Sequence, residues 1–265
     1  MLMKPILLVH LDTETTGLSD TDHGVHSLGF IGEVVTSDGT ITKGNPEYLG
    51  YWEFNPVGRK RDDYALKVGH TTHEELDARP SHKEFGEDIL TAIDEMVEDA
   101  KMRYEGIRVF MVGSYPQFDV RMIDGMDWDW KMARWFGDGN LVNTKTFIED
   151  LQGRKLYNGT TRKLQDFIDG LNLRGKVVNE IKLLSEAKLR RYGNADPLIV
   201  AKPHTAIYDC VCTLVATRTS AELIEEQVKK DIPKVIAEVW NSNAKAEKAV
   251  ADAQAQVVEA LKGSL

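Results

Sequence analysis

The segment 7–18 places two carboxylates directly after an apolar run, and this arrangement limits what the chain can fold into. The run Leu7 to Leu11 is typical of a buried strand; Asp12 and Glu14 follow, and a Thr-Thr-Gly turn comes next. Because residues i and i+2 of a strand point to the same face, the two carboxylates are expected side by side. Burying two anions is costly unless a cation compensates them, and oxygen-only ligands favour Mg²⁺ or Mn²⁺. The alternative is a solvated strand edge or turn.

The length and composition indicate one sizeable α/β domain with an appendage. The 265 residues are 42% hydrophobic and 28% charged, which is ordinary for a soluble globular protein. The net charge of −9 argues against a protein that coats duplex DNA without specificity. The charge is unevenly distributed, since residues 151–202 hold eleven Lys or Arg against five Asp or Glu. This basic sector suits a phosphodiester enzyme, and a solvated helical face is the equally weighted alternative.

The cysteines and the start of the chain bear on location. Cys210 and Cys212 are two residues apart, too close in a regular element to bridge easily, and we interpret them as buried thiols in a reducing compartment. The apolar residues 5–9 are too few for a signal peptide or a membrane span. We therefore expect a cytoplasmic protein with no membrane partner.

Hydrophobic patterning predicts a mixed sheet with helices on its faces. The expected strands are 5–12, 25–35, one within 41–54, 107–113 and 141–142, and the first three form an antiparallel meander with a hairpin turn at 37–40. The expected helices include one after a capping box formed by Ser81 and Glu84, one over 118–126 and one over 206–217. The order βββαβαβα indicates an α/β fold.

Residues 218–265 differ from the rest and are predicted to form a helical C-terminal extension to a domain of residues 1–217. Pro233 and the stretch 241–243 are expected to separate two helical segments, the second with a thin apolar stripe. This extension packs on the core, pairs with another copy of the chain or binds a protein partner; the sequence leaves the three alternatives open.

Two later segments supply further groups that suit a metal site. Asp119 follows Phe118 at an expected helix start after a buried strand, and His204 lies five residues before Asp209, which opens an apolar helix. An aspartate in an apolar segment is expensive to bury without a cation. Together with Asp12 and Glu14, these groups suit two-metal phosphoryl chemistry.

The same residues carry a family resemblance. The run 12–18, the Phe118-Asp119 pair and the His204-x-Ala206-x-x-Asp209 pattern resemble, in order and spacing, the three motifs of the DEDDh (DnaQ-like) 3′–5′ exonucleases. That family includes the proofreading subunits of DNA polymerases, RNase T and oligoribonuclease. Residues 65–76 with Pro80-Ser81 resemble the family's segment before its first long helix, so the likeness extends over about residues 7–217.

The resemblance implies a fold and a set of roles. It implies a ribonuclease H-like fold with a five-stranded mixed sheet, and His204 as general base. The residues that it implies as ligands of two Mg²⁺ or Mn²⁺ ions, with the first between the two ions, are Asp12, Glu14, Asp119 and Asp209. Another branch of the family has Tyr four residues before the last Asp; Thr205 stands there, so the His branch fits.

The resemblance also implies substrate contacts. The residues expected to line the pocket of the terminal nucleotide are Thr15, Thr16, Gly17 and Leu18, and Phe118 is expected beside it. An ordinary β-turn is the alternative for the first four. Tyr115 departs from the family, which commonly has Asn at that position. It either contacts a nucleotide or is a core tyrosine with a hydrogen-bonded hydroxyl group.

Three functions are compatible with these patterns. The first is a 3′–5′ exonuclease that hydrolyses the terminal phosphodiesters of DNA, with single strands favoured as partner, and releases nucleoside 5′-monophosphates. The second is an exoribonuclease or oligoribonuclease of the same fold. The third is a non-catalytic, polymerase-associated subunit that binds nucleic acid, and the complete ligand set argues against it. No zinc, P-loop or Ser-His-Asp signature is present in the sequence.

Overall fold

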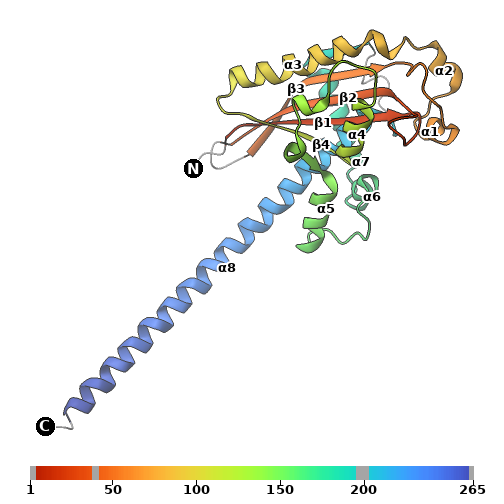
Figure 1. Cartoon of the computed structure of the whole chain (residues 1–265). Helices are drawn as coiled ribbons and strands as arrows, with labels where there is room; N and C mark the ends of the chain where they lie inside the picture. Colours follow the sequence, from red (N-terminus) through yellow and green to blue (C-terminus); the bar gives the residue numbers. More distant parts are fainter. Residues whose placement is uncertain (1–3, 38–41, 195–202, 263–265) are drawn as a thin grey trace. The chain divides into compact units, whose positions relative to one another are not determined.

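A six-stranded mixed sheet forms the centre of the computed structural model, which describes residues 4–37, 42–194 and 203–262 (Figure 1). The described strands are β1 (Ile6–Thr15), β2 (Val25–Ser37), β3 (Thr42–Glu53), β4 (Arg108–Gly113), β5 (Leu141–Asn143) and β6 (Arg190–Gly193). Their order across the sheet is β5-β4-β1-β2-β3-β6. The predicted meander is confirmed, because β1, β2 and β3 pair antiparallel. The hairpin turn predicted at 37–40 falls mainly outside the described residues.

The sheet has one strand more than the five expected. β6 pairs in parallel with the edge of β3, from Tyr48 opposite Arg190 to Tyr51 opposite Gly193. Its sequence, Arg-Arg-Tyr-Gly, is polar and short, so it carries no strand periodicity that sequence reasoning detects. β4 and β5 extend the other edge in parallel, as is usual where helices connect the strands.

Helices cover both faces of the sheet. The described α-helices are α1 (Asp63–Val68), α2 (His73–Ala78), α3 (Gly86–Arg103), α4 (Pro116–Asp124), α5 (Thr144–Gly153), α6 (Leu164–Gly170), α7 (Arg174–Glu186) and α8 (Ala206–Lys262), with 3₁₀ turns η1 (His82–Glu84), η2 (Met132–Arg134) and η3 (Asp138–Asn140). The predicted capping box is confirmed at η1, just before α3. Within the described residues, no helix combines the length and apolar character that crossing a bilayer requires.

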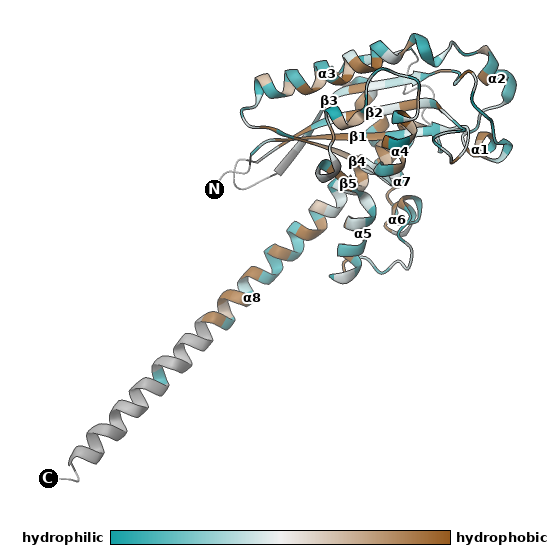
Figure 2. Ribbon diagram, viewed as in Figure 1, coloured by the Kyte–Doolittle hydropathy of each residue, from teal (hydrophilic) through white to brown (hydrophobic). Residues whose placement is uncertain are grey.

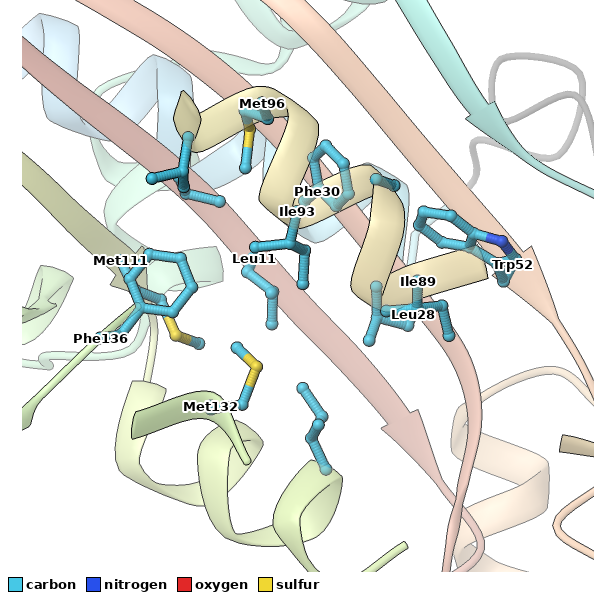
Figure 3. Close-up of a cluster of buried hydrophobic side chains, with 14 of the residues drawn as sticks. Leu11, Leu28, Phe30, Trp52, Ile89, Ile93, Met96, Met111, Met132 and Phe136 are labelled. Atoms are coloured by element: carbon cyan, nitrogen blue, oxygen red, sulfur yellow. The ribbon is translucent and has the colours of Figure 1, made fainter. Parts of the chain in front are cut away.

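The alternation of β1 separates the core from the candidate site. Leu7, Val9 and Leu11 are fully buried in the hydrophobic cluster that α3 covers with Ile89 and Ile93 (Figure 3). Burying side chains of this size contributes about 1.5–3 kcal/mol each, which fixes the register of the strand. The intervening residues, including Asp12 and Glu14, consequently point to the opposite face, where α8 begins.

Gly29 lets the first turn of α8 approach the sheet closely. A Cβ atom at this position in β2 would lie 3.0 Å from the backbone nitrogen of Ile207, and Gly29 is the register partner of Asp12. The Cys210 thiol donates to the carbonyl oxygen of Gly29 at 3.2 Å. Asp209 lies between these contacts in sequence, so backbone packing on Gly29 positions it beside Asp12.

A buried charge network joins α8 to the same face of the sheet. Glu33 of β2 accepts a hydrogen bond from Arg218 at 2.7 Å and contacts His10 of β1 at 3.2 Å. Arg218 also pairs with Glu180 of α7 at 2.9 Å. Burial opposes the ionisation of Glu33, but the hydrogen bonds with His10 and Arg218 and the charge of Arg218 together lower its pKa. Since each buried carboxylate has a partner, the network pins α7 and α8 against the sheet.

The chain divides into two compact units, Met1–Ser220 and Ala221–Leu265. The second unit is helical throughout its described residues, so the expected break at Pro233 and 241–243 is wrong. Proline removes one backbone hydrogen bond, but the surrounding Ala, Glu and Lys residues favour helix, and Asn and Ser only weaken it. Among the residues of this unit whose side chains the structure describes, the exposed large apolar ones follow helical spacing; they are Val228, Ile232, Val235, Ile236 and Val239. Figure 2 shows hydrophobic residues in brown along the earlier part of α8.

Candidate metal centre and nucleic-acid site

Three carboxylates from two elements converge at the end of β1. Asp12 and Glu14 come from the strand and Asp209 from the first turn of α8. Each offers an oxygen atom, and these atoms all lie within 4.8 Å of one another. The i and i+2 spacing of the strand thus places two carboxylates on one face, as the sequence predicts, and the helix adds a third from nearly two hundred residues further along the chain.

Asp119 joins this group from the first turn of α4. It is almost fully buried, and its Oδ1 atom accepts hydrogen bonds from the backbone nitrogen of Thr13 at 3.1 Å and from the Thr13 hydroxyl group at 2.7 Å. Asp119 is outside the set of oxygen atoms within 4.8 Å of one another, but its charge acts on both Asp12 and Glu14. All four predicted carboxylates therefore form one electrostatic cluster.

Burial disfavours the charged form of every member, and repulsion between the carboxylates adds to this at Asp12, Glu14 and Asp119. Burial, followed by the charges of Asp119, Asp209 and Glu14, raises the pKa of Asp12 well above its usual value. Burial, followed by the charges of Asp209 and Asp119, raises the pKa of Glu14 to about 8. Burial raises the pKa of Asp119 and of Asp209 to about 7, although the Thr13 hydrogen bonds partly oppose the effect on Asp119.

The donor set fits a hard divalent cation. Within the described part of the chain, no lysine or arginine forms an ion pair with Asp12, Glu14 or Asp209. Four carboxylates without a cationic side chain are stable together only when protonated or when they share a metal ion. Because all the donors are oxygen atoms, Mg²⁺ or Mn²⁺ is the chemically matched ion.

His204 lies in the turn just before α8, and its side chain is exposed. Its backbone adopts a left-handed conformation with φ of 60°, which is uncommon outside glycine, and its ring centroid lies 6.0 Å from that of His70. His70 has φ of 51° and follows Gly69, which borders Glu14. The predicted base therefore stands in an exposed turn on the chain segment that leads to Asp209, with a second imidazole beside it.

Hydrogen bonds to other segments of the protein hold the Thr-Thr-Gly turn after β1 in place. Thr16 is buried, and its hydroxyl group donates to the carbonyl oxygen of Lys60 at 2.7 Å and accepts from the backbone nitrogen of Gly24 at 3.0 Å. A Cβ atom on Gly17 would lie 2.3 Å from the His23 ring, so any larger residue there would have to displace that ring. Leu18 is 82% exposed and is the turn residue whose side chain is free to contact a base.

Tyr115 and Phe118 occupy different environments at the start of α4. Tyr115 is 52% exposed, which rules out the core alternative, and the Lys145 ammonium lies 5.2 Å from its ring centroid. Phe118 is partly buried and packs against the hydrophobic core. Of these two predicted substrate contacts, Tyr115 is the exposed one, and Phe118 is partly taken up by packing against the core.

The basic loop 59–61 is engaged within the protein. Arg59 pairs with Asp127 at 3.2 Å, Lys60 with Asp22 at 3.2 Å and Arg61 with Asp77 at 2.6 Å. Several arginines of the basic sector are paired likewise; they are Arg154, Arg162, Arg174 and Arg190. These contacts favour a structural role for much of the positive charge.

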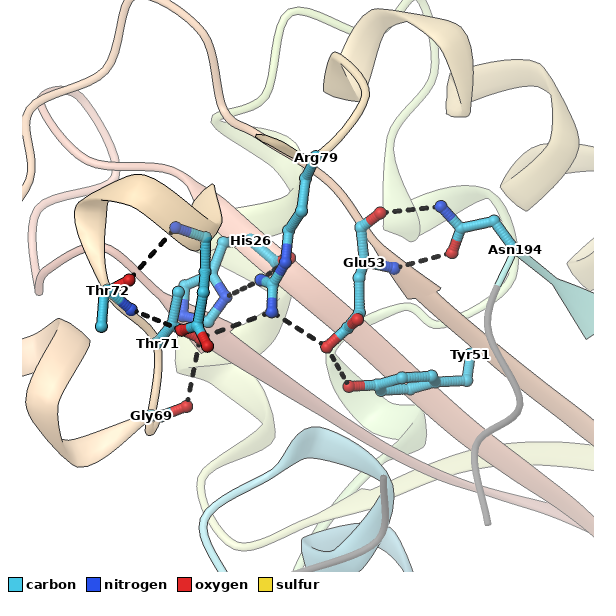
Figure 4. Close-up of polar contacts among 9 residues, drawn as sticks. His26, Tyr51, Glu53, Gly69, Thr71, Thr72, Arg79 and Asn194 are labelled. Carbon is cyan, nitrogen blue, oxygen red and sulfur yellow. Dashed lines mark hydrogen bonds and ion pairs between the residues drawn. The ribbon is translucent and has the colours of Figure 1, made fainter. Parts of the chain in front are cut away.

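Sequence reasoning missed a buried polar group next to Glu14. His26 in β2 is 1% exposed and receives a hydrogen bond from Arg79, which also pairs with Glu53 at 3.0 Å (Figure 4). Burial and the Arg79 charge lower the pKa of His26 to about 3, so its ring is neutral. A histidine near the start of a largely apolar strand was the available signal, but its partners come from segments that the sequence does not bring together.

Comparison with known proteins supports the fold. No family model and no curated protein match the chain. Among solved structures, E. coli exonuclease I in complex with a dT13 oligonucleotide is 12% identical over 83% of this chain and 41% of its own, with a TM-score of 0.50. A full-length 3′-exonuclease is 10% identical over 83% of this chain and 62% of its own, with a TM-score of 0.48.

The similarity to exonuclease I confirms the fold class at the level of architecture. At such low identity a likeness shows the fold alone, which is the ribonuclease H-like α/β fold of the exonuclease neighbours. The chain spans about two fifths of the length of exonuclease I. The site must therefore be argued from its own residues.

Proposed function

We propose that this protein is a metal-dependent 3′–5′ exonuclease that hydrolyses terminal phosphodiesters of DNA, with single strands favoured, and releases nucleoside 5′-monophosphates. The observation that supports it most directly is the convergence of Asp12, Glu14 and Asp209, with Asp119 acting on them by its charge and no lysine or arginine of the described residues paired with any of the four. The motif resemblance to DEDDh exonucleases and the fold likeness to an exonuclease crystallised with dT13 agree with it.

The proposed roles follow from where the side chains lie. Asp12 and Glu14 on β1 and Asp209 on α8 would hold two Mg²⁺ or Mn²⁺ ions, with Asp12 shared and Asp119 completing the set. The ions, when bound, supply a Lewis acid that stabilises charge on the phosphate in the transition state. Thr13 fixes Asp119 by two hydrogen bonds, so this carboxylate is oriented before any ion arrives.

His204 is proposed as the general base. An exposed imidazole is suited to remove a proton from the attacking water at neutral pH. His204 lies in the turn before α8, five residues before Asp209 in the sequence. Leu18 and the ring of Tyr115 are proposed to contact the terminal nucleotides, because both are exposed near the ends of β1 and α4.

RNA is the alternative substrate, because the same carboxylates would serve an exoribonuclease or oligoribonuclease. The preference for deoxyribose or ribose would then depend on the groove that binds the substrate. The non-catalytic, polymerase-associated binding subunit is the third possibility that the assay separates. We further propose that residues 1–217 form the catalytic domain and that the extension 218–265 self-associates or binds a protein partner. A cytoplasmic location, suggested by the free buried thiols Cys210 and Cys212, belongs to the same proposal.

The decisive assay uses oligonucleotides of DNA and RNA, single- and double-stranded, each labelled at the 5′ end. We expect stepwise shortening of single-stranded DNA from the 3′ end in Mg²⁺ or Mn²⁺ and none after chelation. Asp209→Asn should remove activity, whereas Asp231→Asn, which alters an exposed carboxylate of the second unit, should not. Shortening that persists in excess chelator, or binding without cleavage, would contradict the proposal.

A further inference from the structure

His26 holds a buried nitrogen atom that has no partner among the described residues. The side chain is 1% exposed, and its Nε2 atom makes no hydrogen bond there. His26 lies where the pairing of β1 and β2 shifts register, between the partners of Glu14 and Thr15. Buried polar atoms are nearly always paired, so an unpaired one beside a candidate metal centre needs an explanation.

Arg79 determines which ring nitrogen of His26 carries the proton. A guanidinium nitrogen of Arg79 lies 3.1 Å from Nδ1 of His26, and a guanidinium group can only donate. Nδ1 is therefore the acceptor, and in the neutral ring the proton resides on Nε2. Arg79 is itself held by Glu53 at 3.0 Å, which also accepts from the Tyr51 hydroxyl group at 3.0 Å (Figure 4).

The Nε2 atom and the Glu14 carboxylate face the same small space. A Cβ atom placed on Gly69 would lie 3.2 Å from Nε2 of His26 and 3.4 Å from Oε2 of Glu14. The absence of a side chain at Gly69 keeps this space free. A donor with a fixed tautomer thus stands next to a carboxylate that belongs to the four-carboxylate cluster.

We propose that His26 is a positioning residue for Glu14: its Nε2–H group donates to the Glu14 carboxylate, directly or through one water molecule in the space beside Gly69, and orients it as a metal ligand. This inference rests on the proposed metal site. Groups that hydrogen-bond to a metal ligand orient it, and their loss typically lowers metal affinity about 10–100-fold. The series Tyr51, Glu53, Arg79 and His26 would then transmit the rigidity of β3 and the loop after α2 to the site.

The first test measures Mn²⁺ affinity of the full-length protein by calorimetry. His26→Phe removes the donor at similar volume and should weaken binding about 10–100-fold. His26→Gln, whose amide nitrogen reaches nearly the position of Nε2, should restore most of the affinity. His82→Phe is the matched control, because His82 is also buried with an unpaired Nε2 atom, but its other nitrogen contacts the Asn55 carbonyl oxygen instead.

The second test fills the space without altering His26. Gly69 has φ of −75° and ψ of 9°, which alanine adopts readily, so Gly69→Ala should fold normally. Its methyl group would stand between Nε2 and Oε2, and we expect a loss of Mn²⁺ affinity similar to that of His26→Phe. Unchanged affinity in Gly69→Ala and in His26→Phe would overturn the proposal.

A third measurement needs no variant of His26. ¹⁵N NMR of the imidazole should show a neutral ring protonated at Nε2, with a resonance that shifts when Mg²⁺ is added. A ring protonated at Nδ1 would overturn the inference, as would equal losses in His26→Gln and His26→Phe or in His82→Phe. Asp209→Asn separates the failure of the His26 proposal from the failure of the proposed metal site. If Asp209→Asn no longer binds Mn²⁺ while His26→Phe still does so with wild-type affinity, the metal site stands and the role of His26 fails. Wild-type protein that binds no Mn²⁺ would overturn both proposals.

Discussion

Individual residues at the site carry unfavourable energies that the fold must offset. Asp12, Glu14, Asp119 and Asp209 are all disfavoured as anions, and one pKa unit corresponds to about 1.4 kcal/mol between two protonation states. A protein that keeps such a cluster retains a strong driving force to bind either protons or cations. The same residues therefore link stability, metal affinity and pH.

The metal-free protein is predicted to lose stability as the pH rises from about 6.5 to about 8.5. Folding raises the pKa of Glu14 to about 8 and of Asp209 to about 7, so in this range the folded state holds protons that the unfolded state has lost. The lowered pKa of His26 acts in the opposite sense only below about pH 6.5, where the unfolded ring takes up a proton. Thermal unfolding in chelator at several pH values measures the effect.

Cations should remove this pH dependence. Mn²⁺ or Mg²⁺ replaces the protons, so the metal-loaded protein is expected to be more stable at pH 8.5 than the metal-free protein, by an amount that grows with ion concentration. Asp209→Asn, which removes one titrating group and its repulsion, should flatten the slope of the metal-free curve. A metal-free protein whose melting temperature rises across this range would contradict the assignment of the four carboxylates.

His204→Ala is predicted to reduce kcat by about 10²–10⁴-fold, the usual contribution of a general base. Because the side chain is exposed, stability and Mn²⁺ affinity should stay close to wild type. His73→Ala, which removes another exposed imidazole that pairs with Asp63 at 2.8 Å, is the matched control and should retain activity. Near-wild-type kcat in His204→Ala would show that another group takes the proton. His70, whose ring centroid lies 6.0 Å from that of His204, would be a candidate.

Among the helices and strands, the sequence predicts those with a periodic hydrophobic pattern and misses those without one. The alternation in β1 and the spacing of Ile89, Ile93 and Met96 in α3 are strong periodic signals, and both elements form as expected. β6 has a single apolar residue, Tyr192, which is too little for a strand pattern, and it pairs with the edge of β3. Pro233 predicts a break by local rules, but the helix formers on either side outweigh it.

The packing of α8 on β2 is predicted to depend on Gly29. In Gly29→Ala the methyl group would lie 3.0 Å from the nitrogen of Ile207 and 3.1 Å from the carbonyl carbon of Ala206, and backbone cannot rotate away as a side chain can. We expect a loss of about 1–3 kcal/mol in the free energy of unfolding, with weaker Mn²⁺ binding because Asp209 shifts. Denaturant titration and calorimetry measure the two quantities.

Gly175→Ala provides the control for that substitution. Gly175 lies within α7, and a Cβ atom there would meet nothing within 4 Å, so alanine should stabilise the protein by up to about 1 kcal/mol. Equal stability of Gly29→Ala and wild type would mean that α8 can move outward without cost, and the close approach would not be what positions Asp209.

At the scale of the whole molecule, the site is assembled from positions that no local rule connects. Asp12 and Glu14 are paired by strand geometry, which the sequence predicts directly. Asp119 and Asp209 join them only through the parallel pairing of β4 with β1 and the packing of α8, so the motif resemblance was needed to anticipate them. His26 and Arg79 belong to no such motif, and the tertiary structure alone brings them to Glu14.

The second unit raises a separate question, because several of its apolar side chains that the structure describes are about half exposed. Val228, Ile232, Val235, Ile236 and Val239 are each between 44% and 61% exposed and lie along one side of α8. Fully burying such a side chain contributes about 1.5–3 kcal/mol. Pairing of two copies would bury the exposed half of these side chains on both, which would stabilise the dimer by roughly 10 kcal/mol. Association costs about 4–15 kcal/mol, and the balance predicts a weak, concentration-dependent dimer rather than an obligate one.

We therefore predict that sedimentation of the full-length protein shows mass increasing with concentration toward a dimer. Ile236→Lys, which places a charge in the stripe, should keep the protein monomeric, whereas Ala237→Lys adds the same charge about 100° further around the helix and should not. Both variants should retain exonuclease activity, since the carboxylates belong to the first unit. A wild-type protein that stays monomeric at all concentrations would rule out self-association and leave a different protein as the partner of the stripe.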